Sequence, residues 1–365
     1  MTDPTLLVVR VAGVDLSIDD IKGGLFAASL FPYLAFLYCL GRPESKTPEL
    51  GLFGFRFLLV FVVATIPAAI AAKAMYGAQL ADVDWLHGPA EAFLTLTNLC
   101  IVLGFRRAVA GVDASFKDEW MTKLFSASWA APGAVVLAVA ALSSGGMVAG
   151  MHAEPGNALS LPTWMVHVSS LIEWLAAMSL IWRYAETTGN PRWKELTVAM
   201  IPFHSSGLCA CTYHLFYNAP PVRGLVLLQA VLTLVGNFTC WAAAYRIFTY
   251  ARDTPALGPA AGVSQARVAA AAGAGGTGAE QRVARSEEGT AGVASHTNDL
   301  DITEFEYLGS LFALVLAGSV LVKWGSLFLD LPFEPNLGTA LTVIAVPSLI
   351  NCLTWWGRSW GRRAR

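Results

Sequence analysis

The chain has 365 residues, of which 55% are hydrophobic and 14% are charged, and its formal net charge at pH 7 is −2. Together with a mean hydropathy of +0.54, this composition predicts an integral membrane protein and excludes a soluble domain with a large core. No basic stripe with interleaved aromatic residues is present, so we expect no binding to nucleic acid. The six cysteines fall in or near apolar segments and indicate no disulfide framework.

Nine apolar segments are long enough to cross a membrane as helices. They lie at about residues 24–40, 54–74, 89–109, 126–150, 162–183, 196–217, 222–248, 305–327 and 338–357. Nineteen of the 24 Lys and Arg residues lie on alternate inter-helix segments, which follow the first, third, fifth, seventh and ninth spans. Because basic loops stay on the side where the chain is synthesised, we expect the N-terminus outside and the C-terminus inside.

Residues 1–23 precede the first span as a segment on the outer side of the membrane. This segment shows no signal-peptide pattern, and it is not rich in Ser and Arg and poor in acids as a transit peptide would be. Either the first span directs targeting, or a presequence is missing from the chain.

Two three-span units, residues 24–110 and 159–250, show internal similarity. In the second span of each unit an Ile-Pro pair, ending at Pro67 and Pro202, frees a backbone carbonyl that can hinge the helix or line a cavity. A three-span unit that starts outside ends inside, so a second copy in the same orientation requires one extra crossing. The linking segment, residues 111–158, supplies that crossing and gives a 3+1+3 arrangement of parallel repeats.

The chain after the second unit divides into two parts. Residues 251–303 are rich in Ala and Gly without apolar periodicity, which predicts a flexible linker. Residues 304–365 contain the last two spans as a C-terminal helical hairpin. We therefore predict an all-α integral membrane protein with about nine transmembrane helices.

Polar residues gather in the fifth and sixth spans. His204, Cys211 and His214 share one face of the sixth span, and the antiparallel fifth span carries His167 and Glu173. A rise of about 1.5 Å per residue sets the depth of each side chain. It predicts that His167 faces His214 near the outer surface and that Glu173 faces His204 near the middle of the membrane.

These four residues allow several interpretations. A carboxylate at mid-membrane costs several kcal/mol unless it is paired, so Glu173 and His204 are expected to pair, as structural hydrogen bonds or on a solute or proton pathway. A third interpretation is a metal, haem or chlorophyll-type Mg-porphyrin site with His167 or His214 as axial ligand. Motifs of metalloproteases, serine hydrolases, P-loop proteins and Cys-x-x-Cys sites are absent, so we assign no metal ligands and no catalytic residues and expect no enzyme.

Two asparagines hold matching places in the third span of each unit. Asn98 and Asn237 each follow an Ala-x-Leu-Thr-Leu stretch. They either bond neighbouring helices or flank a central polar site. At the outer mouth of the third span, His87 and Glu91 share a helix face beside Asp84, as an interfacial anchor or a gate.

Two stretches resemble known families. The stretch 159–247, with LSLPTWMVHVSSLIEWLAAMSLIWRYAETTGNPRWKEL, IPFHSSGLCACTYHLFYN and LQAVLTLVGNFTCWAAAYRI, resembles the hypothetical chloroplast reading frame 49 family, also catalogued as domain of unknown function 2499. The stretch 26–108, with FAASLFPYLAFLYCLGR and DVDWLHGPAEAFLTLTNLCIVLGFRRA, is similar to domain of unknown function 3593. The resemblance implies a cyanobacterial or plastid membrane, either thylakoid or inner envelope, with the C-terminus in the stroma or cytoplasm.

Two functions follow as hypotheses. The first is a carrier for a small polar solute, with Asn98, Asn237, Glu173 and His204 on its path. Its layout is similar to that of the sugar-transporting SWEET and PQ-loop group, although this chain has no Pro-Gln pair in its spans and adds two further spans. The second is a non-enzymatic accessory or assembly factor in the bilayer for a photosynthetic complex, with pigment or haem on His167 and His214.

Overall fold

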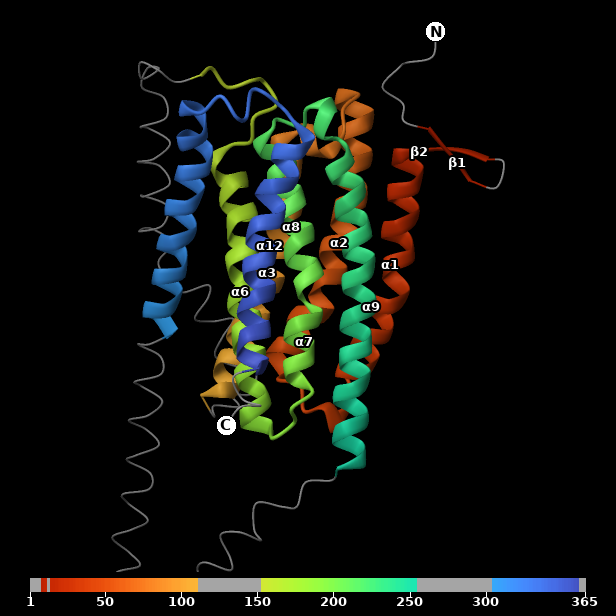
Figure 1. Cartoon of the computed structure of the whole chain (residues 1–365), viewed down its shortest axis with the longest axis vertical. Helices are drawn as coiled ribbons and strands as arrows, with labels where there is room; N and C mark the ends of the chain where they lie inside the picture. Colours follow the sequence, from red (N-terminus) through yellow and green to blue (C-terminus); the bar gives the residue numbers. More distant parts are fainter. Residues whose placement is uncertain (1–7, 12–13, 111–151, 255–303, 361–365) are drawn as a thin grey trace, which may run out of the picture.

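The computed structural model describes residues 8–11, 14–110, 152–254 and 304–360, which form a bundle of long, roughly parallel and antiparallel helices (Figure 1). In chain order the elements are β1 (Val8–Val11), β2 (Val14–Ser17), α1 (Ile18–Leu40), η1 (Pro43–Ser45), α2 (Glu49–Tyr76), η2 (Leu80–Asp82), α3 (Asp84–Val109), α6 (Leu161–Thr188), α7 (Trp193–Ala199), α8 (Ile201–Leu215), η3 (Pro220–Val222), α9 (Gly224–Asp253), η4 (Leu321–Gly325), η5 (Ser326–Phe328) and α12 (Leu337–Trp360). A further helix begins at residue 304 and leads into η4.

Seven helices in the described part are long and apolar enough to cross a membrane. The sixth expected span, 196–217, is divided between α7 and α8, and the fourth, 126–150, lies outside the described residues. The predicted membrane character is confirmed. The count of nine spans and the 3+1+3 arrangement stay predictions.

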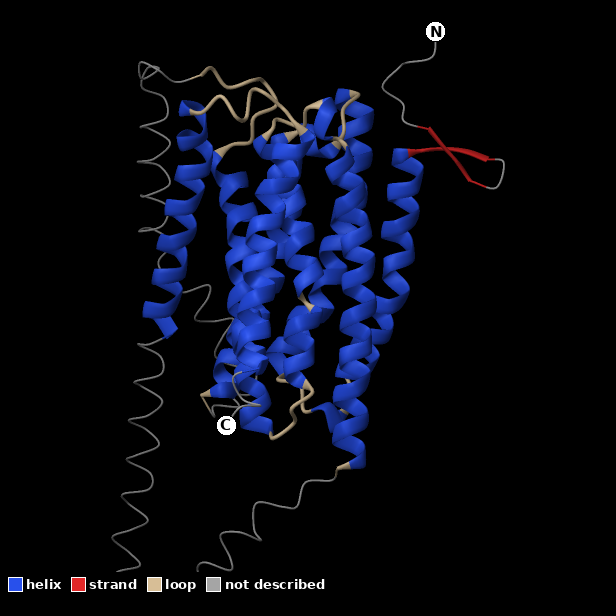
Figure 2. Ribbon diagram, in the orientation of Figure 1, coloured by secondary structure: helices blue, strands red, loops and turns tan. Residues whose placement is uncertain are grey.

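The bundle itself is helical, as expected, but a small β-hairpin precedes it (Figure 2). Strands β1 and β2 pair antiparallel, with Val8 opposite Ser17 and Val11 opposite Val14. Ser17 then begins α1 through a capping box, in which its hydroxyl accepts from Asp20 N over 3.1 Å and its own N–H donates to Asp20 Oδ2. We did not predict this hairpin within the outer segment.

The two ends of the bundle differ in charge. The end that carries the β-hairpin is called the outer end here, and the opposite end the inner end (Figure 1). The inner end carries the α1–α2 connection with Arg42 and Lys46 and the α6–α7 connection with Arg192 and Lys194. The chain direction of the described helices is thus consistent with the alternation of basic loops.

The helices of the two units pack against one another. Helix α1 lies along α9 and α3 lies along α6, while α2 packs on α3 and α12 packs on α8. The crossing of α2 and α3 depends on glycine, because a Cβ on Gly104 would collide with the backbone N of Gly51. The opposite side of α2 is exposed and apolar, with exposed fractions of 66% at Val63 and 64% at Ile70, as lipid-facing positions require.

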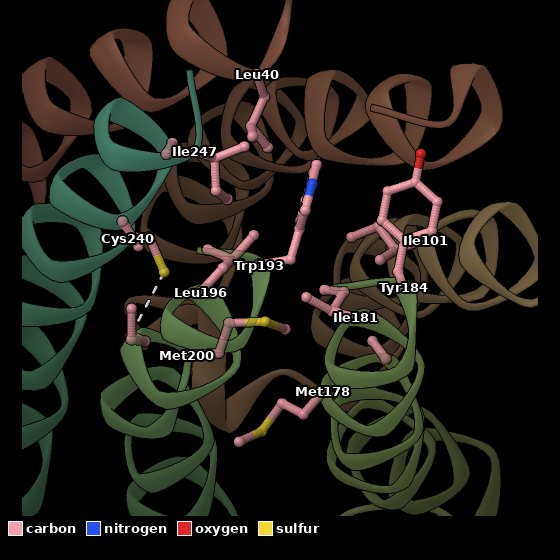
Figure 3. Packing of buried hydrophobic residues seen from close by; sticks show 14 of the residues in the cluster. Leu40, Ile101, Met178, Ile181, Tyr184, Trp193, Leu196, Met200, Cys240 and Ile247 are labelled. Atoms are coloured by element: carbon pink, nitrogen blue, oxygen red, sulfur yellow. Dashed lines mark hydrogen bonds between the residues drawn. The ribbon is translucent and has the colours of Figure 1, made fainter. Parts of the chain in front are cut away.

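The main hydrophobic core fills the inner half of the bundle (Figure 3). Trp193, Leu196 and Met200 lie between α9, which carries Cys240, and α6, which carries Met178. Buried apolar side chains of this size exclude water. The core therefore closes the inner half.

The second span of the second unit is broken, whereas that of the first is continuous. Helix α7 ends at Ala199 and α8 starts at Ile201, with Pro202 in its first turn, where a missing N–H is tolerated. The carbonyl of Met200 accepts from Trp174 Nε1 over 3.1 Å, and that of Ala199 accepts from Thr239 Oγ1 over 2.9 Å. Pro67 lies inside the unbroken α2. The two prolines were expected to act alike, but only Pro202 lies at a helix break.

Candidate functional site

Three buried histidines from three helices meet near the outer end of the bundle. His87 lies in the first turn of α3, His167 in the second turn of α6 and His214 at the end of α8. Their exposed fractions are 6%, 4% and 5%. These three residues are called the histidine cluster.

The rings of the histidine cluster are in mutual contact. The Nε2 atoms of His87 and His167 are 3.0 Å apart, which allows one ring to donate a hydrogen bond to the other. The ring centroids are 5.1 Å apart for His87 and His167, and 4.9 Å apart for each of the other two pairs. One nitrogen from each ring lies within 4.8 Å of the other two. The three residues therefore share one small polar site.

Close approach of α3 and α6 brings His87 and His167 together. A Cβ on Gly88 would collide with the hydroxyl of Thr163, so a larger residue would push the helices apart. The start of α6 is also tied to the start of α3, since Ser160 N donates to Asp84 Oδ1 over 3.0 Å. The Ser160 hydroxyl in turn caps α6 by accepting from Thr163 N over 3.4 Å.

A strained turn after α8 positions His214. Tyr217 and Asn218 have positive φ values of 51° and 57°, a conformation that Asn tolerates better than most residues. Asn218 Nδ2 donates to Asp82 Oδ1 over 2.7 Å and to Ala81 O over 3.2 Å. These bonds fix the end of α8 against the α2–α3 connection, and they hold His214 beside His87.

The histidine cluster has unused hydrogen-bonding capacity. Nδ1 of His87 and Nδ1 of His214 are buried and have no hydrogen-bond partner among the described residues. A neutral imidazole carries one donor and one acceptor nitrogen, and an unsatisfied buried group costs about 1–3 kcal/mol. The site is therefore suited to water, a solute or a metal ion.

A second layer of polar side chains lies about halfway along the helices. It consists of Asn98, Glu173, His204 and Asn237, with exposed fractions of 2%, 3%, 5% and 5%. One polar atom on each has no partner in the described part of the chain, namely Asn98 Oδ1, Glu173 Oε2, His204 Nδ1 and Asn237 Oδ1. These four residues are called the middle polar layer.

The predicted pairing of Glu173 with His204 is not found. Glu173 Oε1 instead accepts from the Ser169 hydroxyl over 2.7 Å, one turn earlier on the same helix. His204 and His214 both lie in α8, so the interruption at Met200 does not alter their spacing. The Ser169 hydroxyl bonds Glu173 instead because it lies one turn away on the same helix.

The two matching asparagines are buried, as expected, but no hydrogen bond between described residues joins them. Asn98 Nδ2 donates to the Ser170 carbonyl of α6 over 3.3 Å, which is a helix-to-helix bond. Asn237 lies on α9 and keeps its Oδ1 unpaired. Their roles on a solute path stay a prediction.

The predicted meeting of His167 and His214 is confirmed, since their rings stack with centroids 4.9 Å apart. His87, which the sequence indicated as an interfacial anchor or a gate, is their third partner. Its depth in the membrane could have predicted this contact, because His87 lies as close to the outer end of its helix as His167 and His214 lie to theirs. The stacking of His167 on His214 leaves no gap for a macrocycle between the two rings, and His167 or His214 singly as an axial ligand of haem or chlorophyll stays a prediction.

Acidic side chains surround the outer end above the cluster. Asp84 and Asp82 lie close enough to His87 to act on it electrostatically. Glu154 accepts from Lys323 Nζ over 2.8 Å. Burial raises the pKa of Tyr217 to about 12, with a further contribution from the Glu154 carboxylate and an opposing one from a hydrogen bond with Ser326. The carboxylates of Asp84 and Asp82 favour a cation beside His87.

Comparisons with known proteins match both three-span units of the chain. Residues 22–110 match the family described as protein of unknown function (DUF3593), and residues 158–246 match that described as protein of unknown function (DUF2499). A Ycf49-like protein of Synechocystis sp. is 48% identical over 103 residues, which are 28% of this chain and 99% of the relative. The chain belongs to the Ycf49-like family.

A second relative, the uncharacterized protein ycf49 of Cyanophora paradoxa, is 38% identical over 85 residues, which are 23% of this chain and 83% of the relative. No solved structure matches the chain. The predicted resemblance is confirmed, and the chain is a cyanobacterial or plastid-type protein with membrane-spanning helices. His87 comes from the first matched region and His167 and His214 from the second. The histidine cluster thus requires both regions.

Proposed function

We propose that this protein is a carrier for a small polar solute in a cyanobacterial or plastid membrane, either the thylakoid or the inner envelope. Its N-terminus lies on the lumenal or outer side and its C-terminus on the stromal or cytoplasmic side, as the basic inner end favours. The observation that supports the carrier most strongly is the middle polar layer. Each of its four residues keeps a buried polar atom without a partner among the described residues.

Unsatisfied polar atoms at this depth favour a bound solute. Each costs about 1–3 kcal/mol, and no lipid group can satisfy it inside the hydrocarbon region. Glu173 is the strongest case, because a carboxylate inside a membrane marks a solute or proton path by default. A polar solute or ordered water would complete these bonds.

The packing fits one state of an alternating-access cycle. The histidine cluster and the middle polar layer lie outside the main hydrophobic core, which closes the inner half. The span is interrupted at Met200 beside Pro202, a place where transporter helices can bend near the substrate. Opening toward the inner side requires α7 to move away from α6.

The accessory or assembly role rests on the plastid resemblance, the Ala/Gly-rich linker and the added C-terminal hairpin. The printed names of the two relatives state no partner, and the stacked His167–His214 pair leaves no room between the rings for a pigment. Photosynthetic complex subunits stay possible partners of the bilayer-embedded chain, and gentle co-purification tests that proposal.

Transport into proteoliposomes tests the carrier directly. Purified full-length protein would be offered a panel of labelled sugars, amino acids, carboxylates and inorganic ions. Any flux should fall at least tenfold in the double variant Asn98→Ala, Asn237→Ala. Asn190→Ala is the matched control, since Asn190 is buried at the inner end and its Nδ2 bonds the Ile247 carbonyl. Unchanged flux for every solute in the double variant would remove the proposal.

A further inference from the structure

We infer that the histidine cluster binds one divalent transition-metal ion of the zinc class, with one nitrogen from each of His87, His167 and His214 as ligands. The inference concerns binding, so it stands whether the chain carries a solute or not. It goes beyond the carrier, because the middle polar layer lies deeper and contributes none of the three ligands.

The spacing of the nitrogens suits a single ion. Zinc binds imidazole nitrogen at about 2.0–2.1 Å in tetrahedral geometry, which places two ligating nitrogens about 3.3 Å apart. The Nε2 atoms of His87 and His167 are 3.0 Å apart, and all three ligating atoms lie within 4.8 Å of one another. Small rotations of the three rings are enough to surround an ion.

A purely structural role explains the cluster less well. Three neutral imidazoles have three donors and three acceptors, yet among the described residues one hydrogen bond joins the rings, between the Nε2 atoms of His87 and His167. All three rings are more than nine-tenths buried. An ion bound at Nε2 leaves Nδ1 of His87 to donate to an ordered water, as ligating histidines commonly do. An ion uses one lone pair from each ring and replaces weak ring-to-ring contacts with three coordinate bonds.

The surroundings suit a cation. Asp84 and Asp82 lie near His87 at the mouth, and their negative charges offset part of the charge of a bound ion. Asn218, which bonds Asp82, fixes the turn that follows His214. A water molecule can fill a fourth position.

The donor set selects the class of metal. Three neutral nitrogen ligands suit Zn²⁺, Cu²⁺, Ni²⁺ or Fe²⁺, whereas Mg²⁺ and Ca²⁺ require oxygen ligands. Three protein ligands with an open fourth position also distinguish this site from closed structural zinc sites. We therefore expect an exchangeable ion.

Metal binding to the purified full-length chain tests the inference. The protein, without a histidine tag, is stripped with a chelator in mild detergent and titrated with Zn²⁺ by calorimetry and with Co²⁺ by visible absorption. We expect one Zn²⁺ per chain and a Co²⁺ spectrum with nitrogen coordination. Mg²⁺ should give no signal.

Histidine variants locate the ion. His87→Ala, His167→Ala and His214→Ala should each weaken Zn²⁺ binding by more than the roughly 10- to 100-fold that loss of an outer-shell partner costs. His204→Ala and His152→Ala are controls. His204 is buried but lies outside the cluster, and His152 is half-exposed and paired with Asp330. Gln replacements repeat the test if an Ala variant fails to fold. Absence of stoichiometric binding, or equal affinity in cluster and control variants, would overturn the inference.

Carrier and metal site are separable in these experiments. The double variant Asn98→Ala, Asn237→Ala should lower flux at least tenfold and keep Zn²⁺ binding. If the wild-type protein transports a solute but binds no Zn²⁺, the metal site is wrong and the carrier proposal is unaffected.

Discussion

The outer and inner halves of the bundle are built from the same helices and both contain an apolar cluster, but the histidine cluster lies in the outer half alone, beside the cluster that includes Phe216, Val222 and Leu225. Helices α3 and α6 carry His87 and His167 near their outer ends and Phe105 and Tyr184 near their inner ends. The inner pair packs edge to face, with centroids 5.2 Å apart, and Trp193 joins it at 5.5 Å from Phe105. The outer pair is polar and incompletely satisfied.

The difference shows how a long membrane helix separates stability from function along its length. Burial of aromatic rings in the inner half stabilises the bundle, while the unpaired polar atoms of the outer half and the middle layer destabilise it in the absence of a ligand. Proteins retain such costly groups where binding requires them. Substitutions in the two halves should therefore have opposite consequences.

The largest effect is expected at the centre of the inner half. Phe105→Ala removes a fully buried ring and should lower the free energy of unfolding by about 3–5 kcal/mol. Thermal unfolding in a fixed detergent measures the change. Phe31→Ala is the matched control, since Phe31 is 74% exposed at a lipid-facing position and should change stability little. Equal losses from the two variants would contradict a structural inner half.

The next effect tests the helix crossing that supports the inner half. Gly104→Ala places a methyl group against the backbone of Gly51 and should separate α2 from α3, at a cost of about 1–3 kcal/mol. Gly23→Ala meets nothing within 4 Å and should be neutral or slightly stabilising. The same unfolding assay compares the two variants. Unchanged stability in Gly104→Ala would mean that α2 and α3 pack less closely at this crossing than the structure shows.

The middle polar layer should behave in the opposite way. Glu173→Gln keeps an acceptor for Ser169 and removes a buried carboxylate with an unpaired oxygen. We expect stability to rise by about 1 kcal/mol while flux falls. Glu186→Gln, on the same helix with its side chain 56% exposed, should change neither. A loss of stability in Glu173→Gln would show that this carboxylate has a structural role.

The smallest effect is expected at the rim. Asn218→Gly retains the positive φ but loses the bonds to Asp82 and Ala81, which should cost about 0.5–1 kcal/mol. Zn²⁺ affinity should fall about tenfold, since the end of α8 positions His214. A double-mutant cycle with Asp82→Ala isolates the side-chain bond. Additive effects would mean that the Asn218–Asp82 bond does not support the cluster.

The sequence predicted the contact of this site that lies within one helical hairpin. The meeting of His167 and His214 followed from the helical rise and an antiparallel pair. His87 was missed because it comes from the other three-span unit, and the packing of α3 on α6 is not encoded in any local pattern. Local periodicity sets depth, but it does not identify which helices are neighbours.

The two prolines show the same limit. Both positions looked alike in sequence, yet only Pro202 lies at a helix break. Two carbonyls beside that break also accept from neighbouring helices, Ala199 from Thr239 on α9 and Met200 from Trp174 on α6. Whether a proline interrupts a membrane helix depends on such donors from neighbouring helices. The Glu173–His204 pairing failed for another reason, since Ser169, one turn earlier on the same helix, bonds Glu173 instead.

The central claim is that the polar outer half and middle layer admit water or solute while the inner half is dry. Radiolytic hydroxyl labelling of the protein in membranes, read by mass spectrometry, tests it in one measurement. The account predicts labelling of His167, His204 and His214 and protection of Trp193, Met178 and Phe105. Equal protection of both sets would show a bundle packed dry throughout and would contradict the proposed binding region.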